Sequence, residues 1–443
     1  MITEKNVLKA LDKIIDPDFN KDIVSLGFVK NIRILGDDIS FDIELTTPAC
    51  PVKNEFQRQA ELAVRSLNGV KTVKVNMTSQ PKKENPLLAQ TPSSLKNVKS
   101  IIAVSSCKGG VGKSTVAVCL ALELAQRGFK VGLADADIYG PSIPTLLNLN
   151  QVPVYANEAN QLIPIEVHHL KVMSFGFLLG DSPAVLRGPL VSRYIQQILH
   201  QTAWGEIDYL FIDMPPGTGD IQITITQSVA LSGAVIVTTK QTLSLVDVAR
   251  GILMFETVKV PMLGIIENMS YFFCDQCGKK HFIFGGSEAD VLRKRFGLST
   301  LVQLPIMSEL TQKFDKPFKN EFIQSAVDRV VMALGKSTIE TKKIPAIQFD
   351  DNQVSLTWPD GKKISISNRD LRLSCRCALC IDELTGKQIL RAEQIPQDIK
   401  AKEITPLGNY AVGIKWSDGH SSGIYPYENI EALIKEKGTT KVT

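Results

Sequence analysis

Two short cysteine motifs offer the clearest chemistry in this sequence of 443 residues, and five of its eight cysteines lie in them. In the first motif two residues separate Cys274 from Cys277, so both thiolates can reach one metal ion or one edge of a cluster. The second motif consists of Cys375, Cys377 and Cys380. A closed thiolate site takes four ligands, so each motif must find its missing ligands elsewhere. Clusters this tight in a long chain indicate metal binding and argue against disulfides.

The segment SSCKGGVGKST, residues 105–115, predicts a phosphate-binding loop between a strand and a helix. Its backbone N–H groups can surround phosphate oxygens, while Lys113 reaches the β- and γ-phosphates of ATP and Ser114 holds Mg²⁺. Cys107 stands where the strict motif has glycine, which leaves an ordinary glycine-rich turn as the alternative. The Lys-Ser-Thr run stands at the positions where the motif requires Lys and Ser or Thr, which argues against that alternative. The predicted nucleotide-binding residues of this loop are Gly109, Gly110, Val111, Gly112, Lys113, Ser114 and Thr115.

Polar side chains follow three of the apolar runs between residues 99 and 340. Asp213 ends the run YLFID and is predicted to hold Mg²⁺ through water, because the carboxyl end of a parallel strand lies beside bound phosphate. Asp135 and Asp137 follow the run KVGLA, and Asp135 is either a second ligand of the metal shell or a cap at the strand end. Asn268 ends a further apolar run, where a lone asparagine is typical of a turn.

The elements that must position these residues are short, β-branched, apolar runs that alternate with helical segments. Near-continuous apolar strands joined through helices predict an α/β fold over residues 99–340, a P-loop NTPase with a mostly parallel sheet covered on both faces. Residues 1–78 predict a small α+β domain before it, and residues 79–98, with three prolines, a linker. Residues 345–443 predict a small β-rich domain with two hairpins, one of them turning at Pro-Asp-Gly.

The composition argues against several classes of protein. A net charge of +4 without a long run of lysine and arginine gives little support for nucleic-acid binding. The sequence has no run of eighteen apolar residues, so no transmembrane helix is expected. The first residues carry charges and lack an apolar h-region, which predicts a folded helix and not a signal or transit peptide. We therefore expect a cytoplasmic protein, or one of the plastid stroma if a transit peptide has been removed, with no membrane or nucleic-acid partner.

The position of Lys108, just before the glycines, makes the loop resemble the deviant phosphate loop of the MinD/ArsA-type dimeric NTPases. This resemblance implies a face-to-face homodimer in which Lys108 reaches the other subunit's nucleotide and stabilises transition-state charge, as an arginine finger does. It also implies that Asp137 orients the attacking water and that Asn268 reads adenine. The predicted catalytic residues are therefore Lys108, Lys113 and Asp137, and the predicted nucleotide site also includes Asp135, Asp213 and Asn268.

The phosphate loop, DADIYGPS, IDMPPGTGD and the Cys-x-x-Cys after ENMSYF occur in this order, which resembles the Mrp/ApbC-type ATPases over roughly residues 95–340. Proteins of that family carry and transfer iron–sulfur clusters. The resemblance implies that Cys274 and Cys277 of two subunits bridge one [4Fe–4S] cluster, which then passes to apo iron–sulfur proteins. Slow ATP hydrolysis is a further hypothesis, because hydrolysis would serve to change the dimer and not to process a metabolite. A redox dithiol, or a zinc knuckle with His281 as a third ligand, is the alternative.

The run LSCRCALC resembles the N-terminal domain of γ-butyrobetaine hydroxylase-like proteins, in which such cysteines and a later histidine bind zinc. Here His420 would complete a Cys₃His site for structural Zn²⁺. A second, transfer-competent cluster site is one alternative, and an ordinary turn histidine at position 420 is another.

Residues 1–78 resemble a small domain that is often fused to iron–sulfur assembly proteins, through DPDF at Asp16–Phe19 and TTPACP at Thr46–Pro51. Cys50 precedes a helix there, where the dipole lowers the pKa of a thiol, so it could contact a cluster transiently. A buried, inert thiol is the competing interpretation.

The three blocks in this order resemble the plastid-type members that supply [4Fe–4S] clusters to photosystem I, and their bacterial relatives. An ATP-dependent iron–sulfur carrier is thus the leading hypothesis. A MinD/ParA-like positioning ATPase is the first rival, although no membrane-binding helix or basic patch supports it. A metal-binding adaptor with a vestigial nucleotide site is the second.

Overall fold

The structure is a computed structural model of the chain. It describes residues 2–436 except for these positions and ranges: 18, 20, 48, 50–52, 80–93, 151, 180–187, 241–244, 285–295, 312, 315–318, 341–343, 378, 382–386 and 408–409. Cys50 and most of the predicted linker, residues 79–98, lie outside the described residues. The chain divides into two compact units, Met1–Glu84 with Asp328–Ile339, and Asn85–Val327 with Glu340–Thr443.

The N-terminal unit is built on a sheet of three strands, β3 (Val29–Leu35), β4 (Asp38–Leu45) and β5 (Thr72–Ser79). Strands β3 and β4 form an antiparallel hairpin, and β5 runs parallel to β4. Alternate residues of β4 are buried, and they pack with α1 (Glu4–Leu11) and α2 (Lys53–Arg65) in one apolar core. A short antiparallel pair, β1 (Ile15–Asp16) and β2 (Lys21–Asp22), also belongs to this unit.

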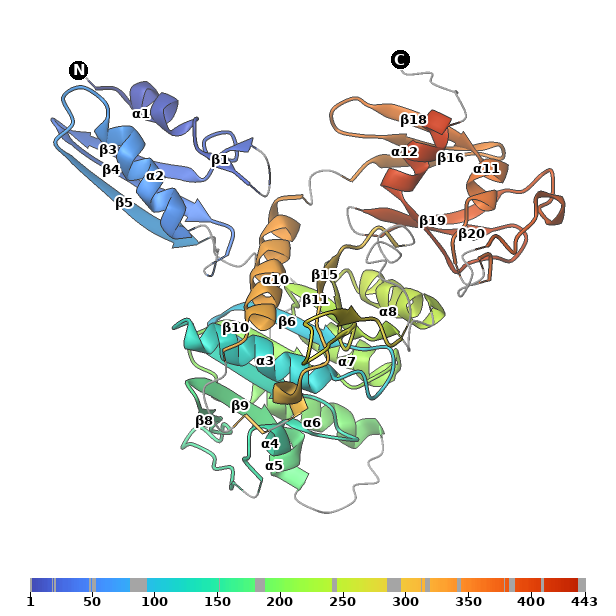
Figure 1. The fold of residues 1–443 in the computed structure, drawn as a ribbon, viewed down its shortest axis with the longest axis horizontal. Helices are drawn as coiled ribbons and strands as arrows, with labels where there is room; N and C mark the ends of the chain where they lie inside the picture. Colours follow the sequence, from blue (N-terminus) through green and yellow to red (C-terminus); the bar gives the residue numbers. More distant parts are fainter. Residues whose placement is uncertain are drawn as a thin grey trace. The chain divides into compact units, whose positions relative to one another are not determined.

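The second unit contains an eight-stranded sheet in the order β15-β12-β11-β6-β10-β7-β9-β8 (Figure 1). Its neighbouring strands are parallel except for the edge pair of β8 and β9. This arrangement confirms the predicted P-loop NTPase fold with a mostly parallel sheet. In sequence order the strands are β6 (Val98–Ser105), β7 (Val131–Asp135), β8 (Ile165–Val167), β9 (Leu170–Ser174), β10 (Ile207–Asp213), β11 (Gly233–Thr238), β12 (Met262–Glu267) and β15 (Thr300–Gln303).

Helices cover this sheet because its central strands are apolar on both faces. All residues of β7, β11 and β12 are buried, so neither face can lie in water. Helix α3 (Lys113–Gln126) packs against β6, β7 and β10, and α8 (Leu245–Thr257) packs against β11 and β12. The other helices of this part are α4 (Ile143–Leu146), α5 (Phe175–Leu179), α6 (Gly188–His200), α7 (Asp220–Ser228) and the 3₁₀ turn η3 (Ser308–Thr311). Helix α10 (Glu321–Glu340) is divided between the two units, with Asp328–Ile339 in the first.

The C-terminal part has two three-stranded antiparallel sheets and its own apolar core. One sheet contains β16 (Ala346–Phe349), β17 (Gln353–Thr357) and β18 (Lys363–Ser367), and the other β19 (Ala401–Leu407), β20 (Ala411–Trp416) and β21 (Gly423–Pro426). Both predicted hairpins are confirmed, as the pairs β17–β18 and β20–β21. Helices α11 (Asn368–Leu373) and α12 (Tyr427–Glu436) and the 3₁₀ turn η4 (Ala392–Gln394) complete it. Ile430 and Ile434 of α12 are buried, so this helix packs against the core of the C-terminal part.

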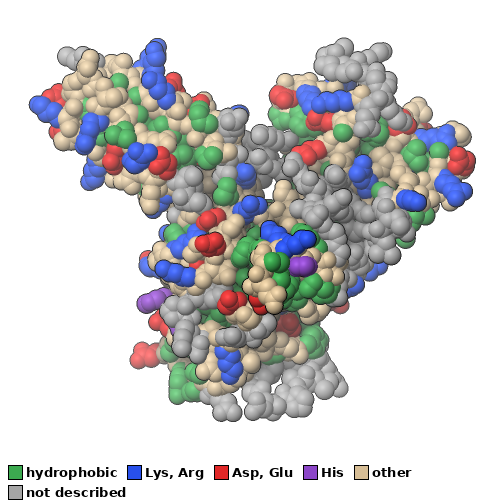
Figure 2. Space-filling model, in the orientation of Figure 1, with side chains coloured by type: hydrophobic (Ala, Val, Ile, Leu, Met, Phe, Trp, Pro, Cys, Tyr) green, Lys and Arg blue, Asp and Glu red, His purple; other side chains and the backbone are tan. Residues whose placement is uncertain are grey.

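The charged side chains on the surface are distributed as the small net charge of the sequence suggests. Figure 2 shows lysine and arginine interspersed with aspartate and glutamate among the described residues of the face drawn, without one continuous basic patch. Within the described residues, no helix combines the length and the apolar character needed to cross a bilayer.

Candidate nucleotide and metal sites

The phosphate loop lies between the end of β6 and the start of α3. Gly110 and Gly112 have φ of +80° and +79°, a left-handed conformation that glycine adopts without strain. A Cβ at Gly112 would also collide with the side-chain amide of Asn268, so this position needs glycine for space as well. Gly112 caps α3 without a side-chain hydrogen bond, which leaves the helix N-terminus open to an anion.

Lys113 points into a group of buried carboxylates. Its Nζ lies 2.5 Å from Asp213 Oδ1 and 3.8 Å from Asp137 Oδ2, and it donates to Ser114 Oγ at 3.2 Å. The side chain of Lys113 is 6% exposed and that of Asp213 is fully buried. In this structure the lysine is therefore paired with the carboxylate predicted to hold Mg²⁺. To reach a phosphate, Lys113 must turn away from Asp213.

Two carboxylate oxygens at this site have no hydrogen-bond partner among the described residues, Asp213 Oδ2 and Asp137 Oδ1, and both are buried. Burial raises the pKa of Asp213, against the opposing effect of Lys113. A buried carboxylate oxygen without a donor is costly, and a hydrated cation supplies what it lacks. The donor set of Asp213 and the Ser114 hydroxyl therefore fits Mg²⁺.

Asp135, by contrast, has both oxygens occupied by protein donors. Oδ1 accepts from the backbone N–H of Asp137 at 3.2 Å, and Oδ2 accepts from Ser174 Oγ at 2.8 Å and the N–H of Ile143 at 3.3 Å. These contacts tie the end of β7 to the start of α4 and to β9. The geometry favours the strand-end cap over a metal ligand for this residue.

Asp135 also predicts how stability depends on pH. Burial, and next the Asp213 carboxylate, raise its pKa from 3.8 to about 8. The folded state then binds this proton more tightly than the unfolded chain, so this group's contribution to the free energy of unfolding falls as the pH rises from about 4 to about 8. We expect Asp135→Asn to flatten that fall in urea unfolding across this window. The control is Asp220→Asn, which removes an exposed carboxylate and should leave the slope of the unfolding free energy against pH as in the wild type. If Asp135→Asn also left that slope unchanged, the prediction would be contradicted.

Asn268 connects the phosphate loop to the first cysteine motif. It directly follows β12, where its Nδ2 donates to the carbonyl of Val111 at 2.9 Å and its Oδ1 accepts from the N–H of Met269 at 3.0 Å. Met269 has a φ of +53°, so the chain turns sharply toward Ser270. The recognition of adenine by Asn268 stays a prediction, and in this structure its amide binds the loop itself.

Cys274 and Cys277 lie on a small hairpin formed by β13 (Phe272–Phe273) and β14 (Lys280–His281). The N–H of Gly278 donates to the carbonyl of Cys274 at 2.8 Å and closes the turn. Backbone N–H groups, first that of Cys277 and then that of Gln276, bind the Cys274 sulfur and lower its pKa. Such donors favour the thiolate that a metal binds.

The hairpin presents these two thiols outward from an aromatic base. Cys274 is half-buried and Cys277 is exposed. Tyr271 packs edge-on against Phe273 at 5.2 Å between ring centroids, and Lys280 Nζ lies 4.5 Å from the Tyr271 ring centroid. These aromatic contacts hold the turn in place, and the Cys277 thiol stays exposed.

The alternative zinc knuckle with His281 finds no support in the hairpin. His281 pairs with Phe272 across the strands and is exposed. Within the described ranges, the one group of three or more side chains close enough to hold an ion is in the C-terminal part. The hairpin therefore offers two ligands to a metal.

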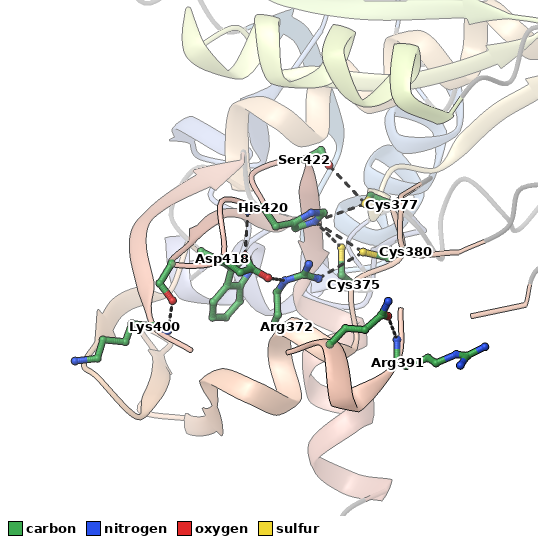
Figure 3. Close-up of polar contacts among 12 residues, drawn as sticks. Arg372, Cys375, Cys377, Cys380, Arg391, Lys400, Asp418, His420 and Ser422 are labelled. Carbon is green, nitrogen blue, oxygen red and sulfur yellow. Dashed lines mark hydrogen bonds and ion pairs between the residues drawn. The ribbon is translucent and has the colours of Figure 1, made fainter. Parts of the chain in front are cut away.

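That group is Cys375, Cys377, Cys380 and His420, brought together from the end of α11 and the turn between β20 and β21 (Figure 3). His420 Nε2 lies 3.3, 3.6 and 4.0 Å from the three sulfurs in that order, and the four ligand atoms lie within 4.8 Å of one another. Tetrahedral zinc, with its ordinary Zn–S and Zn–N bonds, separates sulfur from nitrogen by about 3.6 Å. The set fits a single ion, whereas a cubane cluster spreads its ligands over separate irons.

Hydrogen bonds connect the cysteine sulfurs of this group with one another and with His420. Hydrogen bonds from Cys375 and then Cys380 lower the pKa of Cys377. The pKa of His420 is raised to about 9; burial acts against this shift, and its hydrogen bonds with Cys377 and Cys380 produce it. These four side chains are thus held as a polar cluster inside a buried region.

Lys108 and two further cysteines lie away from these contacts. Lys108 is exposed on the loop, and its action on another subunit stays a prediction. Cys107 packs beside Gly251 of α8, and Cys119 is buried in α3, where burial raises its pKa. Arg372, Ser422 and Tyr425, which contact the sulfurs of the C-terminal group, were not predicted, since no spacing in the sequence marks them.

The parallel sheet, the phosphate loop and the carboxylates at the ends of β7 and β10 define a P-loop NTPase. The chain belongs to the NUBPL iron-transfer P-loop NTPase family, whose model matches residues 97–339. Residues 4–76 match an iron–sulfur cluster assembly protein model, and residues 346–431 match the γ-butyrobetaine hydroxylase-like N-terminal model.

Two curated relatives cover most of the chain. The chain is 45% identical over 447 residues to the Fe-S cluster assembly factor HCF101, chloroplastic, of Arabidopsis thaliana, with 97% of this chain and 83% of that protein covered. It is 43% identical over 343 residues to the iron-sulfur cluster carrier protein of Synechocystis sp., with 76% of this chain and 97% of that protein covered. These relatives support the predicted resemblance to iron–sulfur carriers of plastid and bacterial type.

Proposed function

We propose that this protein is an ATP-dependent carrier that binds a [4Fe–4S] cluster between two subunits and transfers it to apo iron–sulfur proteins. The observation that carries the proposal is the hairpin, which presents one half-buried and one exposed thiol, six and nine residues after the loop-bound Asn268. The family and the two curated relatives give the cargo its identity.

The number of thiols argues for two subunits. A [4Fe–4S] cluster takes four thiolates, and each hairpin supplies two, Cys274 and Cys277. The exposure of Cys277 leaves room for a second hairpin to approach. A cluster at such a junction would be released when the two subunits move apart, which suits a carrier.

The nucleotide site is suited to switching. Binding of ATP would draw Lys113 from Asp213 to the phosphates, and Asp213 with Ser114 would then hold Mg²⁺, which neutralises charge on the phosphates. Asp137 would orient water, and Lys108 would act on the nucleotide of the other subunit. Because Asn268 binds Val111 and begins the segment that leads to Cys274, a change in the loop can reach the hairpin. Hydrolysis in this scheme is slow, because it serves to change the arrangement of the two subunits and not to process a metabolite.

Anaerobic native mass spectrometry of the reconstituted full chain tests this function. We expect a dimer that holds one [4Fe–4S] cluster, and we expect it to lose the cluster to an apo acceptor protein faster with ATP and Mg²⁺ than without. A monomer that holds the cluster would contradict the shared site. If the cluster were transferred at the same rate with and without ATP and Mg²⁺, ATP dependence would be contradicted.

The C-terminal group is proposed to hold a resident zinc ion that stabilises its domain. Chelation should then lower the unfolding temperature of this domain by at least about 4–8 °C, the shift that 1 kcal/mol gives in a domain of this size. Calorimetry with and without a strong chelator measures the shift, and elemental analysis measures the zinc.

The matched control for this zinc site removes the other pair of thiols. A Cys274→Ala/Cys277→Ala variant should keep one zinc per chain, because its C-terminal ligands are intact. Loss of zinc from that variant would place the ion on the hairpin and overturn the assignment.

A further inference from the structure

Each sulfur of the C-terminal group has a donor from outside the four ligands. The pairs are Tyr425 with Cys375, Ser422 with Cys377 and Arg372 with Cys380. The Trp416 indole donates to the Tyr425 oxygen at 2.9 Å, which leaves the Tyr425 hydroxyl proton to face the sulfur. Of the three donors, Arg372 carries a charge, and Figure 3 shows it between Cys380 and Asp418.

Arg372 joins the two segments that supply the ligands. It is 5% exposed on α11, where its Nη1 donates to Cys380 Sγ at 3.4 Å and its Nε lies 2.8 Å from Asp418 Oδ2. The other oxygen, Asp418 Oδ1, accepts from the backbone N–H of His420 at 3.0 Å. One guanidinium thus connects a cysteine ligand to the turn that carries the histidine ligand.

The net charge of the metal site explains why a guanidinium contacts the Cys380 sulfur. Three thiolates and a neutral imidazole around Zn²⁺ leave one net negative charge in a buried place. A guanidinium N–H on a sulfur takes up part of that charge. Its planar fork can donate to the sulfur and to the carboxylate at once, which a lysine ammonium cannot do with the same geometry.

We propose that Arg372 is a positioning residue of the C-terminal metal site, which orients His420 through Asp418 and binds the Cys380 thiolate. The inference rests on the zinc site proposed above. Groups that orient metal ligands from outside typically change metal affinity by 10–100-fold when they are removed. Arg372 therefore sets how tightly this site holds its ion and how electron-rich the Cys380 sulfur is.

The test uses the full chain with Cys274→Ala/Cys277→Ala, so that added metal reports on the C-terminal group. Arg372→Met should weaken zinc binding by about 10–100-fold in competition with a chromophoric chelator. With Co²⁺ as the probe, its sulfur-to-metal charge-transfer band should move to longer wavelength, because the sulfur has lost a donor. A change of packing alone would not move that band.

The matched control is Arg369→Met on the same helix, because Arg369 binds Gln397 and the carbonyl of Ala392 and no sulfur. It should keep the zinc affinity and the cobalt spectrum of the parent. An Arg372→Met protein with the parent's affinity and band would overturn the role of Arg372. If Arg372→Met does not fold, Arg372→Lys decides: affinity about tenfold weaker supports the proposal, and unchanged affinity overturns it.

Failure of the underlying zinc site has a different signature. In that case the parent protein, with Arg372 in place, would itself bind neither zinc nor Co²⁺ at one ion per chain. Metal binding by the Cys274→Ala/Cys277→Ala parent therefore distinguishes a failure of the zinc site from a failure of the role of Arg372.

Discussion

Lys113→Ala should lose ATP hydrolysis and should also unfold more easily than the wild type in the absence of nucleotide. The first effect follows from the loss of the cation that binds the phosphates, and contacts of that kind are worth 10²–10³-fold or more in rate, as an order-of-magnitude estimate. The second follows from the structure, in which Lys113 Nζ lies 2.5 Å from Asp213 and 3.8 Å from Asp137. Without the lysine these buried carboxylates face one another with no cation.

The size of the stability loss is set by the buried charge left behind. Removing one partner of a buried ion pair costs about 3–5 kcal/mol, and protonation of Asp213, whose pKa burial already raises, limits that cost. Urea unfolding of the metal-free, nucleotide-free protein at neutral pH measures it, and phosphate release measures hydrolysis.

Two further variants separate these effects. Lys113→Ala/Asp213→Asn should recover stability without recovering hydrolysis, because the unpaired charge is gone but the phosphate contact is still missing. Lys108→Ala, on the same loop but exposed, should change the free energy of unfolding by no more than about 0.5 kcal/mol. Wild-type stability in Lys113→Ala would mean that the Lys113–Asp213 pair does not form in solution.

The sequence predicts much of this site because its signals are local. The apolar strands are continuous, so the parallel sheet and the position of the phosphate loop follow from the run of residues itself. The glycines of the loop mark left-handed backbone at Gly110 and Gly112. The four ligands of the C-terminal group follow from a resemblance, and the structure brings all four together.

The remaining features depend on contacts between distant segments, which spacing does not reveal. From its position Asp135 could be a ligand or a cap, and its hydrogen bonds from Ser174 and Ile143 favour the cap. Arg372 looks like any arginine on a short helix until its burial against Cys380 is known. The pairing of Lys113 with Asp213 joins two motifs that are far apart in the sequence, and neither motif alone reveals it.

Cys277→Ala should lose the [4Fe–4S] cluster completely while keeping its fold and its zinc. Two variant hairpins would offer two thiolates where a cluster takes four. Because Cys277 is exposed, its truncation leaves no cavity in the core, so the protein should unfold like the wild type. Absorption spectra and native mass spectra after anaerobic reconstitution measure the cluster. Gln276→Ala, on the same exposed turn, keeps the backbone N–H that faces Cys274 and should keep the cluster.

Mixed dimers decide where the four ligands come from. When a wild-type subunit pairs with a Cys274→Ala/Cys277→Ala subunit, only two hairpin thiols are present, so a shared cluster should be absent from that dimer. If one subunit held the cluster alone, through its hairpin and other ligands of the same chain, the mixed dimer would keep it. Differently tagged subunits give these species distinct masses in one spectrum. A mixed dimer with a full cluster would therefore disprove the shared site, and its absence, beside loaded wild-type dimers, would leave the two hairpins as its source.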